Sequence, residues 1–103
     1  MKFSELKFEK MGSTFGVDGI QAIVDLGNGC KASVVRHEFS YGGREGLYEI
    51  GFFGPSGDLE EVPEWGDQVN GCLTEEDVEK EIKFLKESVN EQTRWVRYLA
   101  WMV

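Results

Sequence analysis

The sequence has little of the side chains that enzymes use for acid–base and nucleophilic chemistry. His37 is its one histidine, so a Ser-His-Asp or Cys-His arrangement would have to be built around that residue. It falls at the end of an expected strand, where a structural or solvent-facing role is the simpler interpretation. Cys30 and Cys72 each lack a second ligand nearby in sequence, which argues against a zinc site. We therefore expect no enzymatic activity, no bound metal and no cofactor.

The chain also lacks long apolar runs. No stretch approaches the roughly 20 apolar residues of a membrane span, and residues 1–6 lack the apolar core of a signal peptide. These two features predict a cytoplasmic protein without membrane contact. In that compartment free thiols are expected at Cys30 and Cys72 in preference to a disulfide.

Positive charge is scarce: the chain has 11 Lys and Arg against 19 Asp and Glu, and its formal net charge is −8. Because lysine and arginine dominate binding to phosphate backbones, direct nucleic-acid binding is not expected. The length of 103 residues and the hydrophobic content of 41% suffice for one domain, residues 1–103, with its own core.

The negative charge is concentrated in residues 58–81, which hold ten of the 19 carboxylates and a single basic residue, Lys80. The acids of residues 75–81 begin an expected helix, where they complement the helix dipole. The acids before them have no such local role, and they surround a tryptophan. We therefore expect a protein-docking patch made of Asp58, Glu60, Glu61, Glu64, Trp65 and Asp67. The expected partner is a protein with a basic surface; a merely solvated face and a mimic of the DNA backbone are the alternatives.

Residue patterns in the first part of the chain, 1–63, predict mainly β structure. Residues 19–26 and 30–37 alternate at least in part, and the Asn-Gly between them predicts a hairpin with a type I′ turn. Residues 47–53 predict the next strand, and residues 58–62 are a candidate fourth strand at a sheet edge.

Two further segments complete the predicted fold. Residues 3–8 are a candidate edge strand, whereas residues 65–73 resemble a connecting loop. Thr74 and the acids after it predict the start of a helix, with one apolar stripe at Val78, Ile82, Leu85 and Val89. Residues 74–103 are expected to be helical, with a break near residues 90–93 favoured over a continuous helix. The predicted class is α+β: an antiparallel sheet of three to four strands packed by a long C-terminal helix.

Two other segments are candidate binding sites. The glycine-rich loop at residues 40–46 could hold a small anionic ligand through its backbone and Arg44, with the site formed by Tyr41, Gly42, Gly43 and Arg44; a simple strand connection is the alternative. The aromatic C-terminus contains Trp95, Tyr98 and Trp101. These side chains are either core residues or an interface with a partner or a second copy.

Four pieces of the sequence, taken in order, form a larger pattern. They are GIQA at 19–22, NGCKASVVR at 28–36, SYGG with GLYE between 40 and 49, and VNGCLTEEDV at 69–78. This order resembles a group of small uncharacterised proteins encoded in bacteriophage genomes, over about residues 19–85. The chain departs from the group's pattern at Cys30 and Cys72. The resemblance implies a phage origin and an acidic α+β protein, and it implies no activity.

Together these features predict a non-enzymatic protein made in the cytoplasm of an infected bacterial host. It would inhibit a host protein, of the antiviral-defence kind (anti-CRISPR or anti-restriction), through its acidic surface. Two alternatives remain open. One is a self-associating virion or assembly component that uses Trp95, Tyr98 and Trp101; the other is a small-ligand-binding protein that uses the loop at 40–46.

Overall fold

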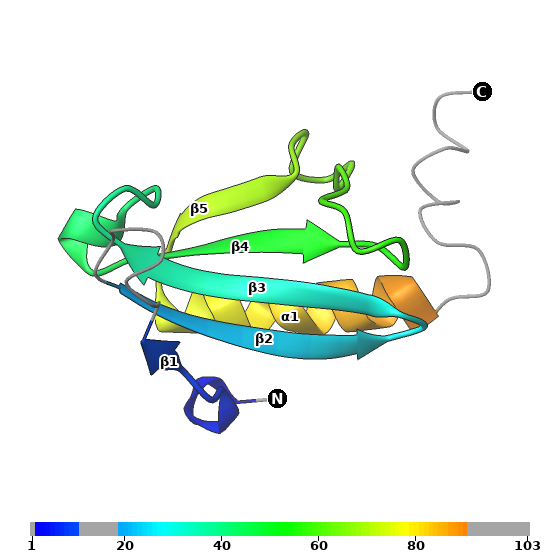
Figure 1. The fold of residues 1–103 in the computed structure, drawn as a ribbon, viewed down its shortest axis with the longest axis horizontal. Helices are drawn as coiled ribbons and strands as arrows, with labels where there is room; N and C mark the ends of the chain where they lie inside the picture. The colour runs from blue at the N-terminus through cyan, green and yellow to red at the C-terminus, as the bar shows by residue number, and fades with distance from the viewer. Residues whose placement is uncertain (1, 11–18, 91–103) are drawn as a thin grey trace.

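The computed structural model describes residues 2–10 and 19–90, which form one antiparallel sheet and one long helix (Figure 1). The strands lie in the order of the chain, β1-β2-β3-β4-β5, and α1 runs across one face of the sheet. The predicted α+β class is confirmed. The elements are η1 (Phe3–Glu5), β1 (Glu9–Lys10), β2 (Gly19–Gly27), β3 (Cys30–His37), η3 (Gly43–Glu45), β4 (Tyr48–Phe53), β5 (Val69–Leu73) and α1 (Glu75–Asn90).

The hairpin of β2 and β3 forms as the Asn-Gly pair predicts. Gly27 pairs with Cys30 across a two-residue turn, in which Asn28 and Gly29 have φ angles of 53° and 79°. Positive φ at both central residues is what a type I′ turn needs. The Asn28 side chain donates a hydrogen bond to the carbonyl of Val89, so this turn is also tied to the C-terminal end of α1.

The predicted count of three to four strands is wrong, because residues 2–10 and 19–90 already form a sheet of five. Residues 69–73, expected to be part of a loop, form β5 and pair with β4. The sequence of this segment does not indicate a strand, because Gly71 and the positive φ of Cys72 (58°) interrupt the alternation of side chains. Hydrogen-bonded pairing with β4 stabilises the extended conformation despite this weak local preference. The candidate strand at 58–62 forms only single bridges, of Leu59 with Phe53 and of Val62 with Asp67.

The N-terminal segment differs from the edge strand expected at residues 3–8. Phe3 lies in η1, and the first strand is the two-residue β1. The Phe3 and Phe8 rings instead turn toward Tyr48, with ring centroids 5.0 Å and 5.7 Å from its ring. The Phe3 N–H also donates to the Glu79 carboxylate of α1. Aromatic clustering thus replaces strand pairing in this segment.

The core lies between α1 and one face of the sheet. It is built from alternate residues of β2, β3 and β4, and the predicted helix stripe is confirmed as its other wall. Its members include Ala22, Val24, Leu26, Ala32, Val34, Ile50, Phe52, Val78, Ile82, Leu85 and Val89. Full burial of one such large side chain stabilises the fold by roughly 1.5–3 kcal/mol. The predicted helical continuation past residue 90, and the break at 90–93, lie outside the described residues.

A reciprocal pair of hydrogen bonds begins α1. The Asp77 N–H donates to the Thr74 hydroxyl oxygen, and the Thr74 N–H donates to the Asp77 carboxylate, each at 3.1 Å. This capping box satisfies backbone groups that a helix start would otherwise leave unpaired. The Thr74 N–H, and then the Thr74 side chain, lower the pKa of the Asp77 carboxyl below its usual value.

We expect Phe52→Ala to lower the free energy of unfolding by about 3–5 kcal/mol, since this fully buried ring would leave a cavity. Phe39→Ala removes the same atoms from a ring that is 69% exposed, and its effect should stay within about 0.5 kcal/mol. Urea unfolding of both variants measures the difference. Equal effects would contradict the described core.

The lowered pKa of Asp77 predicts a pH dependence of stability. The charged Asp77 carboxylate stabilises the folded state fully when the pH is above its pKa in the unfolded chain, about 3.9. This stabilisation is lost as the pH falls through the lower pKa that Asp77 has in the folded protein. Wild type should therefore lose more stability than Asp77→Asn between about pH 6 and about pH 3. Urea unfolding at a series of pH values checks this. Glu87→Gln, at an exposed acid near the other end of α1, is the control and should keep the wild-type dependence.

Candidate functional site

The predicted docking patch lies in the connection between β4 and β5. Asp58, Glu61, Glu64 and Asp67 are exposed there. No lysine, arginine or histidine occurs between residues 45 and 79, so the sequence around these acids supplies no positive charge. The four carboxylates therefore present a local negative field on one short connection.

Glu60 has a different environment from these four acids. It is half-buried, its N–H donates to the carbonyl of Phe52, and its carboxylate lies over Gly54. A Cβ atom at position 54 would overlap the Glu60 carboxylate, so a larger residue there would force this side chain to move. Glu60 is thus part of the packing that shapes the connection.

The connection is held in shape by a tight turn around Val62, which is fully buried. The Val62 N–H donates to the carbonyl of Asp67, and its own carbonyl accepts the N–H groups of Trp65 and Gly66. Gly66 has a positive φ of 67°, which glycine adopts without steric cost. The acids at positions 61, 64 and 67 therefore project from an ordered turn.

Trp65 is the anchor of the patch. Its ring is half-buried against the core, and its indole N–H donates to the Glu81 carboxylate of α1 at 2.9 Å. The two parts of the acidic segment, 58–67 and 75–81, are joined in space by this bond. The sequence assigned Glu81 to the start of the helix and did not predict its bond to Trp65, because nothing local in the sequence links positions 65 and 81.

The glycine-rich loop at 40–46 uses most of its backbone donors internally. The N–H groups of Gly43, Glu45, Gly46 and Leu47 donate to carbonyls of the loop itself, and that of Tyr41 donates to the Glu49 carboxylate. The loop also packs on β5, where the Cys72 N–H donates to the carbonyl of Tyr41. Arg44, expected to hold an anion, forms an ion pair with Glu38 at 3.5 Å. These contacts are those of a folded strand connection.

The remaining predicted sites add little chemistry. The His37 Nδ1 atom accepts the N–H of Phe39, as in a structural turn. Cys30 is buried and Cys72 is exposed, and they do not form a disulfide with each other. Among the described residues no group of three or more His, Cys, Asp or Glu side chains is placed to hold a metal ion. The aromatic residues Trp95, Tyr98 and Trp101 lie outside the described part of the chain.

Comparisons of the chain with protein-family models, with curated proteins and with solved structures find no match. Within residues 2–10 and 19–90, no helix is long and apolar enough to cross a membrane.

The Trp65–Glu81 bond can be measured by a double-mutant cycle. Trp65→Phe keeps an aromatic ring and removes the donor, and Glu81→Ala removes the acceptor. We expect a coupling of about 1 kcal/mol in the free energy of unfolding, reduced from the range for charged hydrogen bonds because the site is partly exposed. Additive effects in urea unfolding would mean that the bond does not hold the connection on α1.

Proposed function

We propose that this chain is a non-enzymatic protein-binding inhibitor that docks on a basic protein surface through residues 58–67 and the adjoining part of α1. The observation that carries the proposal is the hydrogen bond from Trp65 to Glu81, which holds an ordered acidic connection against the helix. A preorganised surface loses less conformational entropy on binding than a mobile loop of the same charge.

The charge of the surface favours a protein partner over nucleic acid. Carboxylates at positions 58, 61, 64 and 67 would repel a phosphate backbone, whereas they attract a surface rich in lysine and arginine. A nucleic-acid-binding protein has such a surface in its channel, and an acidic protein seated there would block it. Inhibition then needs only occupancy, with no catalytic group in the inhibitor.

The resemblance to small bacteriophage proteins supplies the biological setting for the proposal. A phage protein that binds stoichiometrically to a host defence factor would act in the cytoplasm of the infected bacterium. The target class that fits both the charge and the setting is a defence nuclease of the CRISPR or restriction type.

The proposal predicts that Asp58→Lys, Glu61→Lys and Glu64→Lys, combined in one variant, abolish capture of the target from bacterial lysate by the tagged protein. These residues are exposed, so the fold should survive. Once the target is identified, its dissociation constant should rise on the order of a hundredfold in this variant, and wild-type affinity should weaken with added salt.

The matched control carries Glu9→Lys, Glu45→Lys and Glu87→Lys, three exposed acids outside the patch. It changes the net charge by the same amount and should keep target binding. Loss of binding in both variants would show that only net charge matters. Unchanged binding in the patch variant would refute the proposed docking surface.

A further inference from the structure

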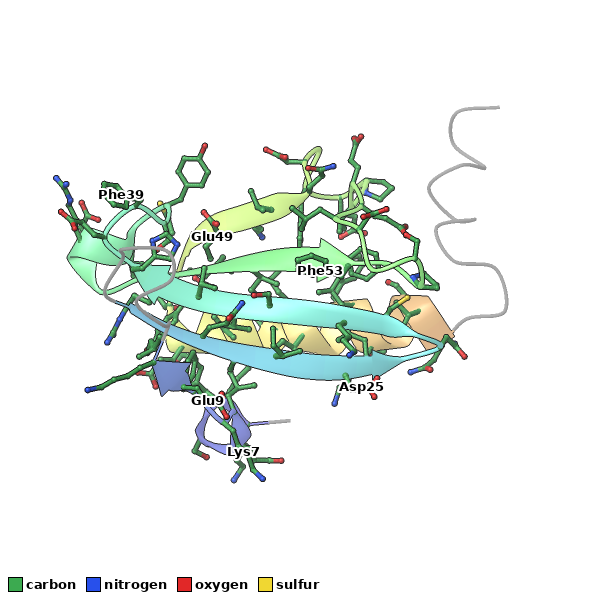
Figure 2. The ribbon with its side chains drawn as sticks, in the orientation of Figure 1. Lys7, Glu9, Asp25, Phe39, Glu49 and Phe53 are labelled. Carbon is green, nitrogen blue, oxygen red and sulfur yellow. The ribbon has the colours of Figure 1, made fainter. Side chains whose placement is uncertain are left out.

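The sheet face opposite α1, here called the open face, carries a second surface that the acidic patch does not explain. The register places its side chains in three rows across the strands. One row is Glu9, Gln21, Val35 and Glu49; the central row is Ile23, Ser33, Gly51 and Val69; the third is Asp25, Lys31, Phe53 and Leu59. Figure 2 shows Asp25, Glu49 and Phe53 on this face, with α1 behind the sheet.

Apolar side chains on the open face are left in contact with water. Ile23 is 57% exposed and Leu59 is 39% exposed, whereas the equivalent positions on the α1 side are almost completely buried. Val35, Phe53 and Val69 are half-buried. Among the described residues, no helix packs on this face. A contiguous apolar surface of this kind marks an interaction site more often than an ordinary solvated surface.

The open face carries three carboxylates, of Glu9, Asp25 and Glu49, and one lysine, and all four charges lie outside its central row. Its central row has no ionisable side chain, and in the third row Lys31 lies directly beside Asp25. The carboxylate of Glu49 already accepts the N–H of Tyr41. A basic partner has little to bind in the central row, and two copies of this acidic chain that meet there bring no like charges together along it.

The shape of the open face is compatible with packing against the same face of a second copy. Ile23 projects from β2, while Ser33 and Gly51 beside it in the central row are small and buried. The side chains of Leu59, Phe53 and Val69 lie close over Gly51, so the hollow beside Ile23 lies toward the β2–β3 turn, where Ile23, Lys31, Phe53 and Pro55 line it. Sheets pack face to face at about 10 Å by interdigitating their side chains. In an isologous contact the Ile23 side chain of each copy can enter this hollow in the other copy.

The size of the face indicates a weak contact. Three rows about 6.6 Å apart over four strands about 4.8 Å apart cover a flat area of about 400 Å² per copy. Two copies would bury about 800 Å², and more with side-chain relief, which approaches the low end of specific interfaces. An area below the standard interface size is typical of a weak contact that depends on concentration.

We propose that the open face is a homodimer interface, in which a second copy of this chain packs sheet against sheet, central row against central row. This interface centres on Ile23 and shares only Leu59 with the acidic segment 58–67, so a dimer would present two docking surfaces to the target. It uses none of Trp95, Tyr98 and Trp101, which the sequence alone suggested for self-association.

Sedimentation velocity of the full chain, from low to high micromolar concentration, tests the proposal. Wild type should shift from monomer to dimer. Ile23→Lys would bury a charge at the centre of the contact, and it should raise the dissociation constant on the order of tenfold or more without unfolding the monomer. Phe39→Lys is the matched control: it exchanges an exposed apolar residue outside the three rows and should dimerise as wild type does.

A third variant, Trp95→Ser with Tyr98→Ser and Trp101→Ser, separates the open face from the C-terminus. Retention of the dimer in this variant, together with its loss in Ile23→Lys, supports the proposal. A dimer that survives Ile23→Lys and disappears in the third variant would overturn it, as would a wild type that stays monomeric at every concentration. If the third variant dimerises and wild type does not, the C-terminal aromatic residues would be the occupant of the open face in wild type. That result would also overturn the proposal.

Discussion

The layer of apolar side chains between α1 and one face of the sheet is the constraint on which the rest of the molecule depends. Phe52, Ile50 and Val34 from the strands meet Ile82 and Leu85 from the helix, and all five are fully buried. Within residues 2–10 and 19–90 there is one α-helix, and it covers one face of the sheet. The apolar residues on the other face and the acids of the β4–β5 connection are the surfaces that we propose for contact with other molecules.

The two proposed surfaces differ in charge and in apolar character. The β4–β5 connection is strongly charged and is held on α1 by the bond from Trp65 to Glu81, so it suits a basic partner found by electrostatic attraction. The open face has no charged side chain in its central row and is apolar around Ile23, so it suits a contact driven by burial of apolar surface. Long-range attraction to one partner and short-range self-contact would thus use largely different residues, with Leu59 at their boundary.

Short sequence patterns predicted the parts of the fold that depend on residues close together in the chain. Asn28-Gly29 specified the hairpin, and the spacing of Val78 and Ile82 specified the buried side of α1. The strand at Val69–Leu73 was missed because its order comes from pairing with β4 rather than from its own alternation. For the candidate site, the exposed acids were predictable from sequence. The bond from Trp65 to Glu81 was not, because it joins elements that only tertiary packing brings together.

Both ends of α1 are tied to the first third of the chain. Near its start Glu79 accepts the N–H of Phe3, 76 residues earlier, and at its end the Val89 carbonyl accepts the Asn28 amide, 61 residues earlier. Contacts of such large sequence separation slow folding, because a long loop must close before they form. During synthesis on the ribosome, the strands must therefore wait with their apolar face uncovered until the helix emerges. A chaperone that shields apolar strands would have its longest opportunity to bind in that interval.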